Sequence, residues 1–486
     1  MRGSWVLAFG CYLALSGCAG HTWTMDGVRD ALRQNDLEEA RARLSDAGRG
    51  TDDLLFALED GLLLHYAGDP ELSNARFEFV EQRIDDLYTK SITRAALSLI
   101  TSDLILKFEP HGIESFLVNY YKGLNYLQLD DERESWVEWR KLASKLQFSR
   151  DQGDAPYLDP PFFDHLVGLG LEKDDPGNAY VALRLAEAGY LAAERTPPDD
   201  LIGDLMRLAA RLGFVDHLDL YRERYGARVW QSEGSAGGRP ADGGGVPADW
   251  GEIVIMVEEG LVAPIHEARV FIPITEARSK RIVAEGRDAQ LEVAEALASE
   301  YDAGRFDATH GAYFDGRELA YVLPMSFPVY GTGEALFERL AVTAAGADTA
   351  WGRIALDVTA LQGEAFRDRL LGIYAKTIAR ALIKYVAAEK LEEKAEEEGG
   401  EAAGDVVGVL ANVVNVVTER ADTRAWLGLP TRIWMARLRV PPGDHDLHLV
   451  FGGGRPGPVA QAEDELILGP IDVRPHERRI INFRTF

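Results

Sequence analysis

The spacing of hydrophobic residues changes part-way along the chain, and this change divides the sequence into two regions. In the first region apolar residues recur at helical spacing, as at Leu54, Leu58 and Leu62. This spacing predicts a helix over residues 53–66, which the turn Gly68-Asp69-Pro70 ends. The first region is therefore predicted to be helical.

The same pattern of helix, acidic turn and helix recurs twice more. One predicted pair consists of a helix over residues 116–127 and, after the turn at Asp130-Asp131, a second helix through Trp136 and Leu142. A further pair covers residues 162–170 and 179–190. Paired helices with small residues at their crossings resemble tetratricopeptide (TPR) repeats, although the consensus is degenerate. We predict a TPR-like helical domain over residues 25–230, with a plain helical bundle as the alternative.

Residues 231–248 read QSEGSAGGRPADGGGVPA and separate the two regions. A segment this rich in glycine and poor in large apolar side chains cannot bury enough surface to order itself. We therefore predict a flexible linker with an r.m.s. reach of about 23 Å, which would let the second domain move relative to the first.

The second region, residues 249–486, mixes short β-rich runs with helices. Its fold class is predicted to be α+β, with terminal antiparallel strands that look like the end of a β-sandwich. The predicted helices cover residues 364–397 and 405–421. The predicted strands cover residues 252–257, 269–274, 319–329, 351–358, 432–440, 446–451, 467–473 and 479–486.

The N-terminus has the features of a secretory signal. A short basic start and an apolar run too short to span a bilayer precede Leu15-Ser16-Gly17-Cys18. This sequence resembles a bacterial lipoprotein lipobox, which implies cleavage after residue 17, lipid on Cys18 and a tether over residues 18–24. Two or more acyl chains anchor a protein stably to a membrane. Ala19 implies the outer membrane, facing the periplasm; an ordinary secreted protein is the alternative.

Composition excludes some functions. The formal net charge is -27, from 79 acidic and 52 basic residues, which disfavours nucleic acid as a partner. Cys11 and Cys18 are the two cysteines. Cys11 leaves with the signal and Cys18 carries lipid, so the mature chain keeps no thiol for catalysis, metal binding or a disulfide.

The sequence contains no catalytic or cofactor motif. It lacks HExxH, CxxC, GxSxG, SxxK, a phosphate-binding loop and a dinucleotide fingerprint. His445 and His448 are three apart on a predicted strand and face opposite sides, so they cannot hold one metal ion together. Glu134-Ser135 resembles the acid of a lytic transglycosylase but lies in a helix that serves packing. We predict a non-enzyme with no metal site and no cofactor.

A charged segment lies where the second predicted helix meets a strand. Its residues Glu419, Asp422, Arg424 and Trp426 precede Leu429-Pro430. Arg424 can pair with Glu419 or with Asp422. We predict a structural clamp at this junction, with a polar pocket as the alternative.

Several segments together resemble a family of uncharacterised proteobacterial lipoproteins with TPR-like repeats. They are the lipobox, residues 120–127 with Trp139-Arg140, residues 251–274, residues 374–385, the segment 419–430 and the strand turn at Pro442-Gly443. The resemblance implies an envelope location, no known catalytic activity and an association with cell-wall synthesis.

These observations lead to one functional hypothesis and two rivals. The chain would be a membrane-anchored adaptor whose helical repeats bind an envelope or cell-wall-synthesis protein. One rival is an enzyme acting on peptidoglycan through carboxylates such as Glu134 or Glu258. The other is a glycan-binding module in the C-terminal region.

Overall fold

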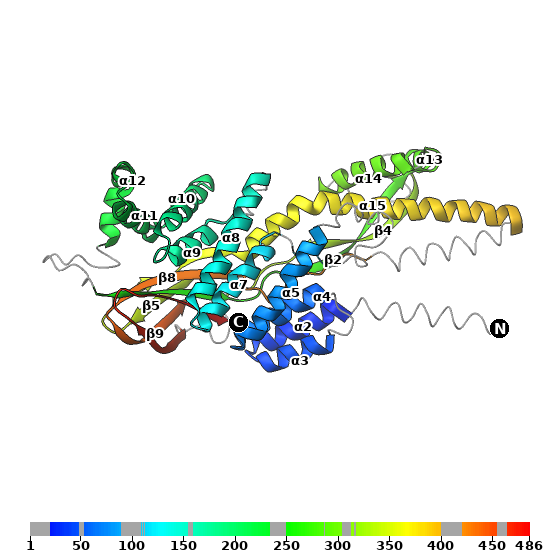
Figure 1. Cartoon of the computed structure of the whole chain (residues 1–486). Coiled ribbons are helices and arrows are strands. Elements are labelled where there is room, and N and C mark those ends of the chain that lie inside the picture. Colours follow the sequence, from blue (N-terminus) through cyan, green and yellow to red (C-terminus); the bar gives the residue numbers. More distant parts are fainter. Residues whose placement is uncertain are drawn as a thin grey trace.

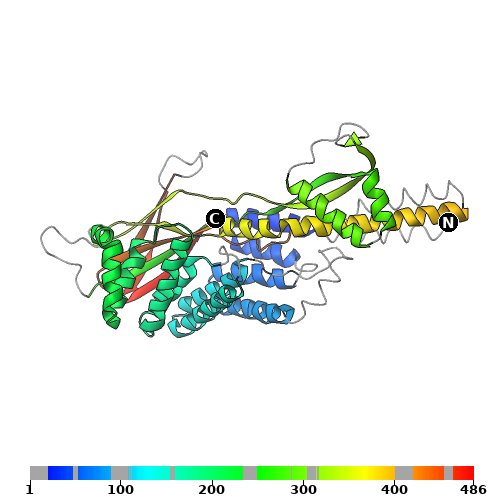
Figure 2. The same ribbon diagram turned by 90° about the horizontal axis from the view of Figure 1, so that it is seen from above.

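The computed structural model describes residues 20–47, 53–88, 108, 110, 112–153, 159–233, 249–285, 287–303, 313–314, 317–399, 420–453 and 464–486. Cys18, Glu419, most of the predicted linker and most of the predicted helix at 405–421 lie outside the described residues. In the described part, helices cover one face of a sheet and a second sheet covers the other face (Figures 1 and 2).

The N-terminal helices pair as hairpins, each of which packs on the next along the chain. Helices were predicted at three of these hairpins, and the structure confirms them. None of the described helices is long and apolar enough to cross a membrane. The pairs are α2 (Gly20–Arg33) with α3 (Leu37–Ala47), α4 (Asp53–Tyr66) with α5 (Pro70–Tyr88), α7 (Glu114–Gln128) with α8 (Glu132–Gln152), α9 (Pro161–Leu171) with α10 (Pro176–Ala192), and α11 (Asp199–Leu212) with α12 (Val215–Glu233).

Both ends of this helical region differ from the predicted boundaries. α2 begins at Gly20, inside the tether that was predicted to reach residue 24. α12 continues to Glu233, past the predicted start of the linker at residue 231. Apolar residues at helical spacing do not extend to these two helix ends. The boundaries predicted from the sequence were therefore wrong by a few residues.

Glycines within the helices allow large side chains to pack closely. A Cβ at Gly123 in α7 would lie 2.0 Å from Trp139 Nε1 on α8, and one at Gly168 in α9 would lie 2.4 Å from Leu183 Cδ2 on α10. Trp139 and Leu183 are fully buried. The small residues predicted at helix crossings therefore have a steric reason.

The substitution Gly123→Ala should destabilise the protein by about 1–3 kcal/mol, because the new methyl group overpacks the Trp139 side chain. Urea unfolding measures the change. Gly203→Ala in α11 is the matched control, since a Cβ there meets no atom within 4 Å. The control should be neutral or stabilising by up to about 1 kcal/mol; equal loss in both variants would contradict the steric argument.

The strands form three sheets in the described residues. We call them the inner sheet (order β11-β1-β8-β7), the outer sheet (β10-β9-β5-β6) and the arm sheet (β2-β4-β3). The bounds are β1 Gly251–Glu259, β2 Ile265–Thr275, β3 Tyr313–Phe314, β4 Arg317–Tyr330, β5 Arg339–Ala344, β6 Ala350–Trp351, β7 Arg353–Asp357, β8 Arg432–Val440, β9 Gly443–Gly452, β10 Asp464–Val473 and β11 Arg478–Thr485.

Strand β1 shows how the inner sheet is covered on both faces. Val254 and Met256 belong to the core shared with the helices, whereas Ile255 and Val257 belong to the core shared with the outer sheet. Alternate side chains of a strand point to opposite faces, so a continuous apolar run such as EIVIMV suits a strand between two layers.

The shared core contradicts the prediction that the second domain moves freely on a linker. One apolar cluster joins helices α4–α12 to β1, β7, β8 and β11. If the two regions separated, the sheet face of this cluster would expose Val254, Met256, Ile433 and Met435 to water. Exposing apolar surface costs roughly 25 cal/mol of free energy per Å². The helical region and the inner sheet therefore form one body.

The order of the last strands also differs from the prediction. β9 and β10 pair antiparallel, as expected. After the turn at residues 474–477, however, β11 crosses to the inner sheet and pairs parallel with β1. The two open-edge strands β10 and β11 thus belong to different sheets, and the final segment is not a hairpin.

A separate apolar cluster holds an arm that extends from this body (Figures 1 and 2). The arm consists of the arm sheet and the helices α13 (Glu276–Ala284), α14 (Arg287–Asp302) and α15 (Val358–Gly399). α15 confirms the helix predicted at 364–397 and is about 63 Å long at 1.5 Å per residue. Neither α13, α14 nor β5 was predicted.

Candidate functional site

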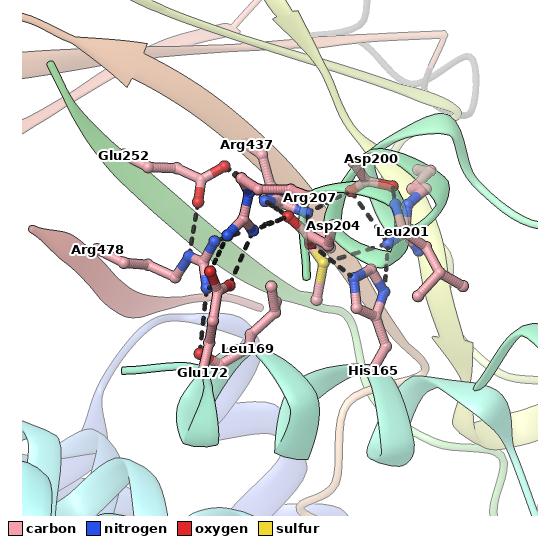
Figure 3. Close-up of polar contacts among 12 residues, drawn as sticks. His165, Leu169, Glu172, Asp200, Leu201, Asp204, Arg207, Glu252, Arg437 and Arg478 are labelled. Carbon is pink, nitrogen blue, oxygen red and sulfur yellow. Dashed lines mark hydrogen bonds and ion pairs between the residues drawn. The ribbon is translucent and has the colours of Figure 1, made fainter. Parts of the chain in front are cut away.

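Charged side chains gather where α9 and α11 meet the inner sheet (Figure 3). We call this set the seam, because every member lies between the helical layer and the sheet. Four carboxylates face four guanidinium groups there. The seam consists of His165, Glu172, Asp200, Asp204, Arg207, Glu252, Arg353, Arg437 and Arg478.

Arg437 on β8 is the centre of the seam. Its Nη1 lies 2.6 Å from Asp204 Oδ2 and its Nη2 lies 3.1 Å from Asp204 Oδ1, a bidentate pair between sheet and helix. Its Nε and Nη2 also donate to Glu252 Oε1 on β1, at 2.9 and 2.7 Å. The side chain is 10% exposed. Arg437 therefore joins α11 to two strands at once.

Arg478 on β11 and Arg207 on α11 extend the seam to α9. Arg478 donates to Glu252 Oε2 at 2.6 Å and to Glu172 Oε2 at 2.7 Å. Arg207 makes a bidentate pair with Glu172 and also bonds Asp204 Oδ1 at 2.6 Å. Glu172 at the end of α9 thus holds one arginine from the sheet and one from the helices.

Arg353 on β7 completes the seam at the other end. It donates to Tyr190 Oη at 3.3 Å and to His165 Nδ1 at 3.1 Å. Burial lowers the pKa of His165, which favours the neutral ring. Because Nδ1 accepts from Arg353, the proton of the neutral ring lies on Nε2. Nε2 lies 4.0 Å from Asp204 Oδ2, beyond hydrogen-bond distance.

Electrostatics make the seam a poor acid–base site. Burial alone would raise the pKa of Asp200, but Arg353 and Arg437 outweigh it and hold the value at about 2. Burial would also raise the pKa values of Asp204 and Glu252, but Arg437 and Arg478 keep both below their usual range. Carboxylates that stay ionised and paired at neutral pH are suited to holding structure rather than to moving protons.

Acid should weaken the seam, and Asp200 gives a measurable part of the effect. Its folded-state pKa of about 2 lies below the unfolded value near 4, so its contribution is present above about pH 4 and is lost as the pH falls towards 2. Asp200→Asn should remove about 2 kcal/mol of pH-dependent stability across that window. Urea unfolding at several pH values measures it. The exposed Asp216→Asn should keep the wild-type pH dependence.

A second buried carboxylate, Glu258 on β1, lies under three tyrosines. Tyr66 Oη donates to Oε2 at 2.6 Å, Tyr120 Oη to Oε1 at 2.9 Å and Tyr121 Oη to Oε2 at 3.2 Å. Glu258 is 0% exposed, and burial raises its pKa. Three hydroxyl groups donate to its oxygens, so Glu258 lies in a closed hydrogen-bond cluster between helices and sheet. Glu258 is one of the two carboxylates that the enzyme hypothesis named.

The predicted junction at residues 420–430 is held from the helices. Glu59 on α4 accepts the amides of Leu427 and Gly428 at 2.6 and 3.0 Å, and Glu114 on α7 accepts the amide of Trp426 at 3.4 Å. Trp426 is 0% exposed and packs against Phe77 and Tyr121. The sequence did not predict these two glutamates as partners of the segment.

Within the junction, Arg424 pairs with Asp422, one of the two partners that the sequence allowed. Its Nε and Nη2 lie 2.9 and 2.7 Å from the Asp422 carboxylate oxygens. Asp422 Oδ1 also accepts the backbone amide of Arg424 at 3.0 Å. The pair is local to the segment, whereas Glu59 and Glu114 connect the segment to the helices.

A cleft of about 780 Å³ opens where the seam reaches the edge of the inner sheet. β11 forms one wall and the α7–α8 hairpin forms another. The lining is polar, with Leu124, Leu127 and Trp136 as its larger apolar side chains on the helical wall. It comprises Leu124, Leu127, Gln128, Asp130, Glu132, Trp136, Lys173, Asp472, Arg474, Glu477, Arg478, Arg479, Ile480, Ile481 and Asn482.

The other residues singled out in the sequence lie apart from this cleft. The amide of Glu134 donates to Asp131, which caps α8. His445 Nε2 lies 2.6 Å from the Pro441 carbonyl, and His448 Nδ1 lies 2.6 Å from Glu465. Over the described residues, no group of three or more His, Cys, Asp or Glu side chains is arranged to hold a metal ion.

No family model matches the chain, and no curated protein matches it. The solved apo form of RapI is similar in part, with 10% sequence identity and a TM-score of 0.32. The similarity covers 44% of this chain and 76% of RapI. At that level it supports no statement about function.

Proposed function

We propose that this chain is a lipid-anchored envelope protein that acts as a rigid scaffold or adaptor on the periplasmic side of the outer membrane. The lipobox and Cys18 support the anchor. We further propose that the helical hairpins are TPR-like and that the two facing sheets are a β-sandwich. The partner would be an envelope or cell-wall-synthesis protein.

The observation that carries the scaffold proposal is the shared core of helices and inner sheet. The seam adds ion pairs with little exposure to that core, and Glu59 and Glu114 fix a C-terminal segment to α4 and α7. The arm, with its long α15, extends from this body. A body of this kind can hold an anchor and a partner at fixed positions.

The same core changes where a partner would bind. The adaptor hypothesis gave the partner a groove on the helical repeats. Here the face of the helices that packs on the inner sheet is already occupied by Val254, Met256, Ile433 and Met435. We therefore place the partner on surfaces outside this core.

Two measurements in cells test the proposal. A palmitate analogue should label the wild-type protein and fail to label Cys18→Ala, which should also leave the membrane fraction. Crosslinking in intact cells should then recover a specific envelope protein with the anchored form and lose it with Cys18→Ala. Equal labelling of both forms would rule out the anchor.

A further test separates the scaffold from its rivals. Zymography on purified cell wall should show no clearing by the full chain if the protein is an adaptor. Clearing that Glu134→Gln abolishes would favour the peptidoglycan enzyme. Recovery of glycan fragments without any protein in the crosslinking experiment would favour the glycan-binding module.

A further inference from the structure

Strand β11 forms an open edge of the inner sheet. Of the described strands, only β1 pairs with it. The amide of Glu252 donates to the Glu477 carbonyl at 2.8 Å, and that of Gly260 donates to the Thr485 carbonyl at 3.0 Å. In a regular parallel pair, alternate residues direct their backbone groups to the same neighbour. The backbone groups of Ile480 and Asn482 therefore point away from β1.

These outward backbone groups belong to residues that line the cleft, and they lack partners among the described residues. No backbone or side-chain group of the described residues bonds the amide or carbonyl of Ile480 or Asn482. Ile480 is 7% exposed, and unpaired buried backbone groups are costly. Trp136 is 8% exposed and lines the same cleft, and its Nε1 has no hydrogen-bond partner in the described part of the chain.

The spacing of these groups fits an extended peptide. Residues 478, 480 and 482 lie two apart on a strand, which places successive outward N–H and C=O groups about 6.6–6.8 Å apart. Another β-strand repeats its own backbone groups at the same distance. The stretch of β11 that lines the cleft, residues 478–482, is about 13 Å long from end to end.

We propose that the cleft binds an extended peptide segment of a partner protein, which adds to β11 as a further strand of the inner sheet. The proposal rests on the adaptor function above and names the kind of partner segment. Side chains on one face of the added strand would contact Leu124, Leu127 and Trp136. Those on the other face would point towards Ile481 and solvent.

The shape and charge of the cleft select this occupant over others. The cleft lies between β11 and the α7–α8 hairpin, so its occupant has to fit between these two walls, as a single extended segment does. The lining holds four cationic side chains and four anionic ones, so it complements a peptide of low net charge rather than a polyanion. The cations are Lys173, Arg474, Arg478 and Arg479; the anions are Asp130, Glu132, Asp472 and Glu477.

The test uses the full chain in detergent and a phage-displayed library of random twelve-residue peptides as the probe. A selected peptide should bind with an affinity that changes little with salt. Methylation of its backbone nitrogens one at a time should weaken binding at every second position only. Amide hydrogen exchange should show Ile480 and Asn482 exchanging faster than Ile481 in the free protein and becoming protected in the complex.

Matched variants locate the binding site. Gln128 is exposed on the helical wall, and Gln128→Trp should weaken binding by roughly tenfold or more by filling the cleft. Gln147→Trp, at an exposed position of α8 that does not line the cleft, should bind as wild type does. Unfolding midpoints of both variants check that they fold.

Four results would overturn the proposal. They are no selected binder, equal binding by both variants, methylation effects without a period of two, and full protection of Ile480 and Asn482 in the free protein. Binding that falls steeply with salt would identify a polyanion site instead. None of these results depends on the lipid or on the cell. A negative peptide-binding experiment therefore does not contradict the lipid-anchored scaffold, and a negative labelling experiment does not contradict the peptide site at β11.

Discussion

Arg437→Ala should reduce the free energy of unfolding by about 3–5 kcal/mol, because it removes the guanidinium group that two buried carboxylates share. Asp204 would lose its bidentate partner, and Glu252 would lose two of its hydrogen bonds. Asp204 is 5% exposed, so water cannot replace what the arginine supplied. Urea unfolding at neutral pH measures the loss.

Arg439→Ala is the matched control for this experiment. Arg439 lies two residues further along β8, on the same face of the strand, and is exposed. Its removal should change the free energy of unfolding by less than about 0.5 kcal/mol. A small loss in Arg437→Ala, comparable with that of the control, would show that the seam does not connect the layers.

Trp426→Ala should cost about 3–5 kcal/mol, since truncation of a fully buried tryptophan leaves a cavity that its surroundings cannot fill. Trp426 packs against Phe77 of α5 and Tyr121 of α7, with ring centroids 6.0 and 6.1 Å apart. The loss would therefore fall on the contact between the C-terminal segment and the helices. Thermal or urea unfolding measures it.

Trp351→Ala controls for the removal of an indole ring. Trp351 on β6 is 68% exposed and should contribute less than about 0.5 kcal/mol to stability. A stability loss in Trp426→Ala no larger than in this control would contradict the role given to the junction. The comparison needs no functional assay.

Elements with strong local periodicity could be predicted from the sequence. The helix at 53–66 has the predicted bounds because leucines at helical spacing lie between an acidic start and the turn at Gly68-Asp69-Pro70. The run at 252–257 is a strand because its β-branched residues cover both faces of the inner sheet. The local pattern of apolar residues is enough to predict these two elements.

Elements whose shape depends on distant partners were missed. α13 and α14 are mostly polar and become helices of the arm by packing Ile282, Val293 and Leu297 against β2, β4 and α15. The parallel pairing of β11 with β1 joins residues more than two hundred positions apart. Local patterns of hydrophobicity do not record such pairings.

The seam could not be predicted for the same reason. Glu252, Arg437 and Arg478 lie on three strands and meet only because the registers of β1, β8 and β11 align them on the helical face. Glu258 and Glu259 are neighbours in the sequence but serve opposite layers, since Glu258 bonds tyrosines of the helices and Glu259 accepts Trp434 Nε1 at 3.0 Å. The sequence showed the charges and not their partners.

The helices and the inner sheet form one body, and cutting the chain between them is the sharpest test of this arrangement. A specific protease site placed at residue 243 would separate the N-terminal and C-terminal parts covalently. We expect the two fragments to elute together after cleavage and to unfold in urea with a single midpoint. Fragments that separate, or that unfold independently at two midpoints, would contradict it.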